Sequence, residues 1–128
     1  MKVFRLMKQD PDGGPTVGIG SMMLGVRPKD PAQLHKRFDV LAIDPADAIA
    51  PGGGGLSVYA ETSAIRISAK KLFLWSIESD ALEPQFSLTA SGPPHYLIGP
   101  SLQMALGEFQ ILLAATRQSW QLEMQETD

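Results

Sequence analysis

The stretch HYLIGPSLQMALGEFQILLAATRQSWQLE, residues 95–123, carries two different patterns on the two sides of Pro100. Residues 95–99 form a short apolar run fenced by prolines and glycines, which is typical of a strand. After Pro100, apolar or small residues recur every three or four positions, and this spacing predicts an amphipathic helix over 101–123. The predicted inner face consists of Leu102, Ala105, Leu106, Phe109, Leu112, Leu113, Thr116 and Trp120. A strand followed by such a helix predicts a helix that packs on a sheet.

The rest of the chain adds short strands and one more helix. Apolar runs predict strands at 2–7, 56–61, 64–68 and 72–77, with broken extended segments at 15–26 and 81–94. An Asp-Pro start, followed by Leu34, Phe38 and Leu41 at helical spacing, predicts a short helix over 30–41. We therefore expect one α+β domain over 1–128, with a small mixed sheet, flanking helices and a polar tail at 124–128.

Composition narrows the possible chemistry. The 128 residues suffice for one domain with a buried core, and they include no cysteine and two histidines. Disulfides and thiolate chemistry are excluded, and the sequence predicts no metal site. A net charge of -3 with scattered lysines and arginines gives little support to nucleic acid as a target. No apolar run approaches the roughly 20 residues that span a bilayer, so we expect no membrane contact and a soluble cytoplasmic chain.

Four consecutive glycines at 52–55 follow Pro51 and must form a loop, because no regular element tolerates their entropy cost. Their amides could receive the phosphate oxygens of a ligand. The alternative is a plain connection between elements, since the run matches neither the GxGxxG pattern nor a Walker motif and enters a strand rather than a helix.

Two polar residues stand in or beside apolar strands. Arg5 lies within the first predicted strand, where an unpaired guanidinium would be costly to bury. It must reach solvent from an edge strand, or else a carboxylate or an anionic ligand. Ser57 opens the strand after the glycines, with Tyr59 on the same face. Its hydroxyl either hydrogen-bonds a ligand or a neighbouring side chain, or caps the loop backbone.

His95 and Tyr96 begin the last predicted strand and point to opposite faces, so only one of them can face a given pocket. His95 is either a hydrogen-bonded structural residue or a catalytic one. Together with Ser57 and with Asp44 or Asp47 it could form a hydrolase constellation, although no nucleophile-elbow motif surrounds the serine.

Three blocks of the sequence together resemble one known family. They are VFRL at 3–6, APGGGGLSVY at 50–59 and HYLIGPSLQMALGEFQILLAATRQSW at 95–120. In this order they are similar to the type VI secretion effector toxins of the Tse-two kind, which have an ADP-ribosyltransferase-like fold. The resemblance covers most of the chain, with almost no contribution from residues 8–40.

The resemblance implies roles for individual residues around NAD, the expected substrate. Arg5 would meet the NAD phosphates, Ser57 would support the pocket on the nicotinamide side, and His95 would occupy the late polar position. His95 and Ser57 are thus the catalytic candidates. The candidates for NAD binding are Arg5, Ser57, Tyr59 and Tyr96.

The sequence departs from the family pattern at two places. Leu56 stands where the family carries a second hydroxyl, so Leu56 does not inherit that role. Many transferases of this fold also use a late glutamate to stabilise developing positive charge, which His95 does not supply. The glutamates Glu61, Glu78 and Glu108 lie in no recognisable motif.

The resemblance implies an antibacterial effector toxin that is NAD-dependent and acts in the cytoplasm of a target cell, by transferring ADP-ribose or by modifying NAD itself. Such a toxin would need a cognate immunity protein in its producer, together with a component of a dedicated secretion system that exports it. The alternative is a noncatalytic interaction domain on the same fold. A serine hydrolase using Ser57 and His95 is the third reading.

Overall fold

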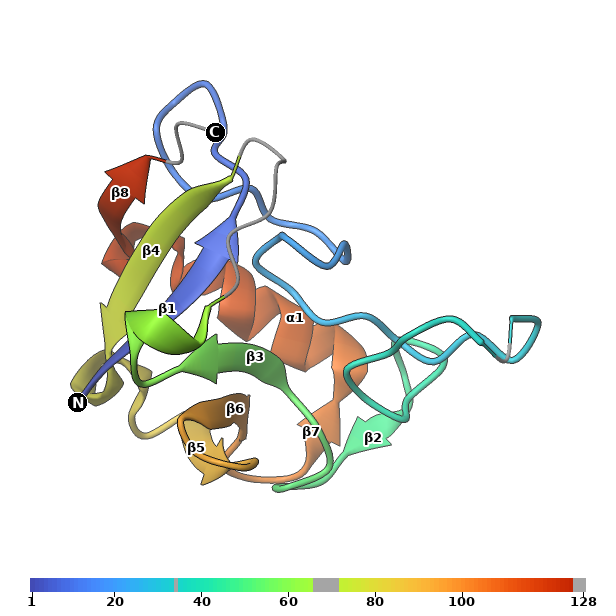
Figure 1. Ribbon diagram of the computed structural model, residues 1–128. Coiled ribbons are helices and arrows are strands. Elements are labelled where there is room, and N and C mark those ends of the chain that lie inside the picture. Colours follow the sequence, from blue (N-terminus) through green and yellow to red (C-terminus); the bar gives the residue numbers. More distant parts are fainter. Residues whose placement is uncertain (34, 66–71, 126–128) are drawn as a thin grey trace.

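The computed structural model describes residues 1–33, 35–65 and 72–125, and Figure 1 shows their arrangement. The strands are β1 (Lys2–Met7), β2 (Ala48–Ile49), β3 (Leu56–Tyr59), β4 (Phe73–Glu78), β5 (Phe86–Ala90), β6 (His95–Pro100), β7 (Met104–Ala105) and β8 (Gln121–Gln125). The α-helix is α1 (Leu106–Ala115), and short 3-10 helices occupy Thr62–Ala64, Ser79–Leu82 and Arg117–Ser119. The predicted α+β class is confirmed.

Six strands form one sheet in the order β5-β6-β3-β1-β4-β8, and β2 pairs separately with β7. Every pairing between these strands is antiparallel, so the predicted mixed sheet is wrong. All six residues of β1 are in register with β4, but only Phe4 is in register with β3, opposite Tyr59. Beyond this pair β1 and β3 diverge, as Figure 1 shows. The candidate site lies at this split in the sheet.

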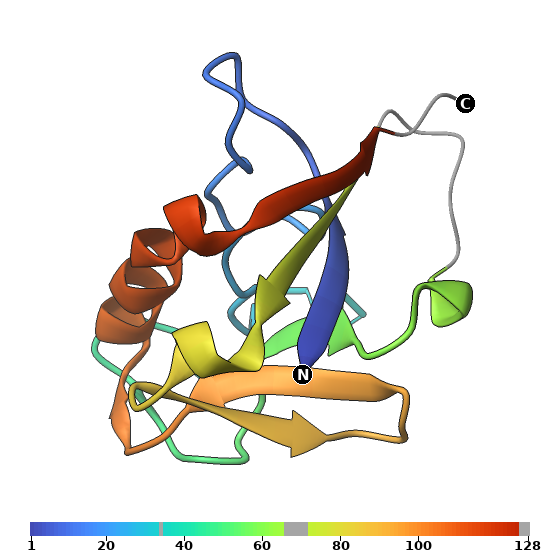
Figure 2. The same ribbon diagram turned by 90° about the vertical axis from the view of Figure 1, so that its left-hand side faces the viewer.

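The hydrophobic core lies between α1 and one face of the sheet (Figure 2). The sheet contributes alternate residues, such as Val3 of β1 and Trp75 of β4, and the helix contributes Phe109, which is fully buried. Strand alternation explains this set, because side chains two residues apart share a face. Removal of their apolar surface from water provides the main stabilisation of the fold.

The predicted helix over 101–123 is too long at both ends. Met104 and Ala105 pair with β2 as strand β7, and the helix ends at Ala115. The chain then turns through a 3-10 helix and returns as β8 beside β4. Trp120 is buried as predicted, but from outside the helix, where its indole Nε1 donates to Thr116 Oγ1 at 3.0 Å.

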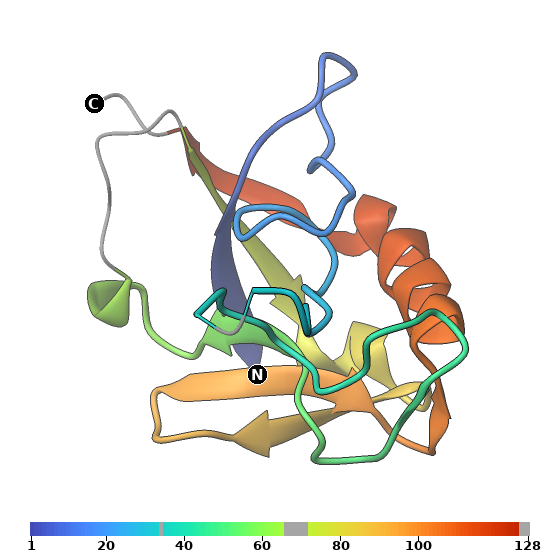
Figure 3. The same cartoon turned by 90° about the vertical axis from the view of Figure 1, so that its right-hand side faces the viewer.

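The predicted helix over 30–41 is wrong. The described part of this segment consists of turns and irregular chain; residue 34 lies outside the described residues. The side chains of its predicted inner face are not buried: Phe38 is 42% exposed and Leu41 is 66% exposed. The segment belongs to the long connection between β1 and β2, which lies beside the split in the sheet in Figure 3. With only one α-helix among the described residues, the sheet is not flanked by helices as predicted.

The strand predictions fare better. The strands at 2–7, 72–77 and 95–99 are confirmed with small changes of boundary, the one at 56–61 is shortened to β3, and β5 lies within 81–94. The segment 15–26 makes only isolated bridges, among them Val17 with Leu24. Most of the predicted strand at 64–68 lies outside the described residues, as do positions 126–128 of the predicted tail, while Met124 and Gln125 end β8.

The glycine run is a loop, as predicted, and two of its members pack closely against other backbone. Gly54 has a φ of +110°, and a Cβ atom there would overlap the carbonyl oxygen of Asp39. The amide of Gly55 donates to that same oxygen at 3.1 Å. The absence of side chains therefore lets this loop hold the segment around Asp39 in place.

No helix among the described residues combines the length and apolar character needed to cross a lipid bilayer.

Candidate functional site

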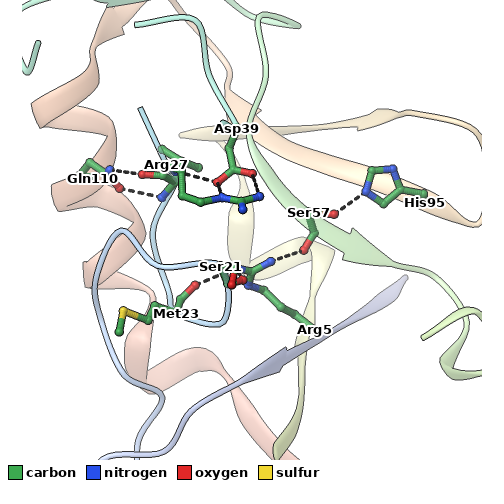
Figure 4. Close-up of polar contacts among 9 residues, drawn as sticks. Arg5, Ser21, Met23, Arg27, Asp39, Ser57, His95 and Gln110 are labelled. Atoms are coloured by element: carbon green, nitrogen blue, oxygen red, sulfur yellow. Dashed lines mark hydrogen bonds and ion pairs between the residues drawn. The ribbon is translucent and has the colours of Figure 1, made fainter. Parts of the chain in front are cut away.

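Arg5 is buried at the split between β1 and β3, with 8% of its surface exposed. Its Nη1 donates to the carbonyl oxygen of Ser57, and its Nη2 donates to the carbonyl oxygens of Ser21 and Met23, each at 2.9 Å (Figure 4). The reading of Arg5 as a water-facing residue of an edge strand is wrong, because β1 is central. Its partners are main-chain carbonyls, and together they join the loop around Ser21 to β3.

Burial lowers the pKa of Arg5 from its ordinary value of 12.5 to about 10, so the guanidinium stays charged at neutral pH. The Nε atom of Arg5 is enclosed and has no acceptor among the described residues. A positive charge is thus fixed at the split, with three carbonyl dipoles that orient it.

Ser57 and His95 meet on the opposite side of β3, where Ser57 Oγ is in hydrogen-bond contact with His95 Nε2 (Figure 4). The other ring nitrogen, Nδ1, lies 3.1 Å from the carbonyl oxygen of Ser91. A carbonyl oxygen only accepts, so Nδ1 carries a proton and, in neutral His95, Nε2 accepts the hydrogen of the Ser57 hydroxyl. The pair therefore has the geometry of a hydroxyl beside a general base.

Asp44 and Asp47, the other members of the predicted hydrolase constellation, do not lie beside His95. Asp47 accepts from the backbone amides of Ile43 and Asp44, both at 2.9 Å, and these two hydrogen bonds lower its pKa. The orienting partner of His95 is the carbonyl of Ser91, so the suggested Asp44 or Asp47 as third member of a triad is wrong. The aspartates lie instead in a turn just before β2, where the carbonyl oxygen of Asp47 accepts from the Leu106 amide at the start of α1.

Tyr59 and Tyr96 lie on different faces of the sheet. Tyr59 stands opposite His95 in the β3–β6 register, and their rings lie 5.0 Å apart between centroids. Tyr96 stands opposite Val58, which is fully buried, and packs against the hydrophobic core. Strand alternation thus places Tyr59 with Ser57 and His95 and removes Tyr96, a predicted NAD-binding residue, from this group.

A pocket of about 480 Å³, the first pocket, opens at the split. Its lining residues are Arg5, Leu6, Ser21, Met22, Arg27, Arg37, Asp39, Ser57, Tyr59 and Ile65. The lining thus includes three arginines and one aspartate, which gives the pocket a net positive charge. His95 does not line this pocket, but it contacts two residues that do, Ser57 and Tyr59. The volume is within the range of about 300–1,000 Å³ that is typical of small-molecule sites.

Arg27 and Asp39 form the ion pair on the far wall of the first pocket (Figure 4). Arg27 Nε donates to Asp39 Oδ2 at 3.1 Å and Nη2 donates to Oδ1 at 3.0 Å, an arrangement in which both carboxylate oxygens are used. The hydrogen bond to Asp39 raises the pKa of Arg27. The loop that carries Arg27 is held to α1 by Gln110, whose side-chain amide bonds both backbone polar groups of Val26 at 3.0 and 2.7 Å.

Sequence reasoning found one wall of this pocket and missed the other. It identified Arg5, Ser57 and Tyr59, which strand patterns place. It did not identify Arg27, Arg37 or Asp39, because these lie in an irregular connection whose sequence has no periodicity. One feature of the sequence could have indicated them. Arg27, Arg37 and Asp39 are three charged side chains in a segment without a regular element, and such side chains need a partner elsewhere in the molecule or in a ligand.

The described residues contain no group of three or more histidine, aspartate or glutamate side chains that could hold a metal ion. Comparisons of the chain with known protein families, with curated proteins and with solved structures find no match.

Proposed function

We propose that this protein is an NAD-dependent effector toxin with an ADP-ribosyltransferase-like fold and activity. The observation that carries the proposal is the first pocket itself, in which Arg5, Ser57 and Tyr59, expected from the family resemblance, line one cavity with two further arginines. The antiparallel sheet that diverges between β1 and β3 is compatible with such a fold.

The charge of the pocket suits a diphosphate. Arginine presents a planar fork of donors that matches phosphate oxygens, and Arg37 is exposed and has no salt bridge among the described residues. Arg5 adds a fixed positive charge beneath it. On this proposal the NAD diphosphate lies against the arginines, and the nicotinamide ribose lies near Ser57 and Tyr59.

Transfer of ADP-ribose breaks the bond between nicotinamide and its ribose, so that nicotinamide departs with the bonding electrons and an acceptor oxygen or nitrogen joins the ribose. The proton of the acceptor needs a base. His95 Nε2 is oriented for this by the Ser91 carbonyl and already faces a hydroxyl. Asp39 supplies the negative charge at the pocket, where the sequence lacks the late glutamate, although Arg27 neutralises part of it.

The biological setting follows from the resemblance. The protein would act in the cytoplasm of a rival bacterium after export by a dedicated secretion system, and its producer would carry a cognate immunity protein. If the pocket catalyses no reaction of NAD, the alternative is that the protein is a noncatalytic interaction domain on the same fold.

The test has two parts. The protein is expressed from a tightly repressed promoter in bacteria that lack any partner gene, and growth and cellular NAD are measured. The consumption of NAD by the purified protein is then measured separately. We expect growth arrest and loss of NAD, both abolished in His95→Ala and in Ser57→Ala. His35→Ala is the matched control, because His35 is the other histidine, is exposed and does not line the first pocket. Harmless growth with a folded wild-type protein and unchanged NAD would refute the proposal and favour the interaction domain.

The hydrogen bond between Ser57 and His95 also favours a second candidate function, a serine hydrolase. In that reaction Ser57 Oγ attacks an ester carbonyl while His95 takes its proton. A serine-directed phosphonate separates the candidates. Covalent labelling of Ser57 that disappears in His95→Ala indicates the hydrolase, whereas an unlabelled protein that consumes NAD indicates the transferase.

A further inference from the structure

A second pocket of about 660 Å³ adjoins the first. Its lining residues are Ile19, Gly20, Ser21, Arg27, Pro28, Lys29, Asp30, Pro31, Lys36 and Ile43. Ser21 and Arg27 line both pockets, so the two cavities lie next to each other at this pair of residues.

The second pocket is also positively charged. Lys29 and Lys36 have no salt bridge among the described residues, and Lys29 Nζ lies 5.9 Å from the ring centroid of Phe38. The one carboxylate in the lining, Asp30, accepts from the backbone amide of Ala32 at 2.9 Å and so serves its own turn. A ligand here would meet two ammonium groups that form no salt bridge with a carboxylate of the described residues.

The shared residue Arg27 is suited to hold a bridging anion. Its Nε and Nη2 are used by Asp39, and its Nη1 has no acceptor among the described residues. Asp39 fixes the plane of the guanidinium, so Nη1 can donate to an anion at little further cost in side-chain entropy.

Beyond the cations, the second pocket has apolar walls. Ile19 is 60% exposed and Ile43 is 43% exposed, and Pro28 and Pro31 complete these walls. Apolar surface beside lysines suits a base attached to a charged sugar-phosphate group better than it suits a simple inorganic anion.

We propose that the second pocket binds the nucleoside half of a nucleoside diphosphate, with its diphosphate at Arg27 and its base between the isoleucines and prolines. The inference rests on the proposed function, because it assigns the half of the NAD-type substrate that lies away from the reacting bond. It assigns Lys29 and Lys36 as specificity residues for this half.

The test compares two ligands by titration calorimetry. ADP carries the nucleoside diphosphate, whereas nicotinamide mononucleotide carries only the part that the first pocket would hold. The variant Lys29→Gln/Lys36→Gln removes the two ammonium groups at exposed or half-buried positions. The matched control is Lys2→Gln/Lys8→Gln, which changes the net charge equally but touches neither pocket. Thermal unfolding of each variant confirms that it is folded.

We expect ADP to bind about tenfold more weakly to Lys29→Gln/Lys36→Gln, the effect of losing two partly exposed charge contacts. Binding of nicotinamide mononucleotide should stay unchanged in this variant, and the control should bind both ligands as the wild type does. The affinity for ADP should also fall less steeply with added salt in the variant than in the wild type.

Failure of this inference is distinguishable from failure of the proposed function. If the wild type consumes NAD but ADP binds equally well to both lysine variants, or does not bind at all, the assignment of the second pocket is wrong and the transferase stands. If ADP binding depends on Lys29 and Lys36 but NAD is never consumed, the nucleotide site stands and the transferase is wrong. An equal loss of ADP affinity in the control also overturns the assignment.

Discussion

Arg5 is a buried charge whose partners are all neutral. Three carbonyl oxygens from two separate parts of the chain accept its hydrogens, and no carboxylate does so among the described residues. Arg5 therefore helps to form the pocket in the protein without a ligand, because it fixes where the loop at Ser21 lies relative to β3. Its role in holding the pocket together can be tested apart from any role in binding.

Substitution of Arg5 should destabilise the protein strongly. Arg5→Met leaves three carbonyl oxygens without their donors, and we expect the free energy of unfolding to fall by about 3–5 kcal/mol, as for other broken buried charge networks. Urea denaturation followed by circular dichroism measures this. Arg37→Met is the control, because Arg37 lines the same pocket but is exposed, and its effect should stay within about 0.5 kcal/mol. Similar small losses for both would show that the carbonyl contacts of Arg5 matter little.

At the scale of single residues, the sequence predicted the strand and the face on which a residue lies better than it predicted the hydrogen-bond partners of that residue. It showed that Arg5 stands in an apolar strand and that Ser57 and Tyr59 share a face, because alternation follows from the backbone alone. It could not show that Ser91 orients His95 or that Ser21 and Met23 receive Arg5, since these contacts are made by backbone carbonyls, which every residue has.

At the scale of elements, α1 does more than cover the sheet. Its side chain Gln110 bonds the amide and the carbonyl of Val26, a fully buried residue of the connection that carries Arg27. This contact replaces the strand pairing that an irregular segment lacks, and so it fixes the far wall of the first pocket.

Gln110→Ala should therefore loosen one loop without unfolding the helix. Two buried backbone groups lose their partners, and we expect a loss of about 1–3 kcal/mol in unfolding free energy. Hydrogen exchange should locate the effect, with faster exchange at the Val26 amide. Ile111→Ala on the same helix is the control, because Ile111 is 70% exposed and its removal should change stability by about 0.5 kcal/mol or less. Unchanged protection of Val26 in Gln110→Ala would contradict this role.

The glycine loop offers a matched pair of substitutions. Gly52 and Gly54 both have positive φ, of +80° and +110°, but a Cβ atom meets nothing within 4 Å at Gly52 and overlaps Asp39 at Gly54. Gly52→Ala should cost about 1–2 kcal/mol from backbone strain alone. Gly54→Ala should cost about 1–3 kcal/mol more, from overpacking. Equal losses by chemical denaturation would mean that the loop does not support Asp39.

The errors in predicting elements have one physical origin. Helical spacing of apolar residues arises both in a helix and in other buried segments, so Trp120 fitted the pattern although its backbone lies outside the helix. Conversely, Phe38 and Leu41 fitted it although neither is buried. Whether a spacing becomes a helix depends on whether a surface is there to pack on, and that surface comes from remote parts of the chain.

At the scale of the whole molecule, Arg117 joins the loop after β1 to the chain beyond α1. Its Nη2 lies 2.5 Å from Asp12 Oδ1 and 3.2 Å from Asp10 Oδ2, and its Nε donates to the carbonyl oxygen of Pro15 at 2.9 Å. Hydrogen bonds from Arg117 and from the Gly14 amide lower the pKa of Asp12 from its ordinary value of 3.8 to about 2. These contacts connect segments more than a hundred residues apart in the chain.

The stability of the molecule should depend on this carboxylate in acid. Between pH 2 and 3.8 the unfolded chain binds more protons at Asp12 than the folded protein does, so stability from this group is complete above about pH 4 and is lost as the pH falls through 2. The stability difference between wild type and Asp12→Asn should therefore shrink over that interval. The control is Asp80→Asn, because Asp80 is exposed and has no salt bridge within the described part of the chain. A difference that is independent of pH would contradict the linkage.

The fold class could be predicted from the sequence, whereas the arrangement of the whole molecule could not. Local patterns identified most strands and the one helix, but the order of strands depends on pairings between distant segments. The first pocket likewise unites Arg5 of β1, Ser57 of β3, and Arg27 and Asp39 of the connection between β1 and β2. Only the wall formed by the strands β1 and β3 has a sequence pattern from which it could be predicted.

The central place of β1 also governs how the chain can assemble. Its two neighbours in the sheet begin at Leu56 and Phe73, so β1 has no strand partner among residues 8–55, which follow it in the sequence. The sheet must close large loops before any of its central hydrogen bonds form, and proteins of such topology fold in about milliseconds to seconds rather than microseconds. In a nascent chain β1 therefore stays without a strand partner until β3 or β4 is free to pair.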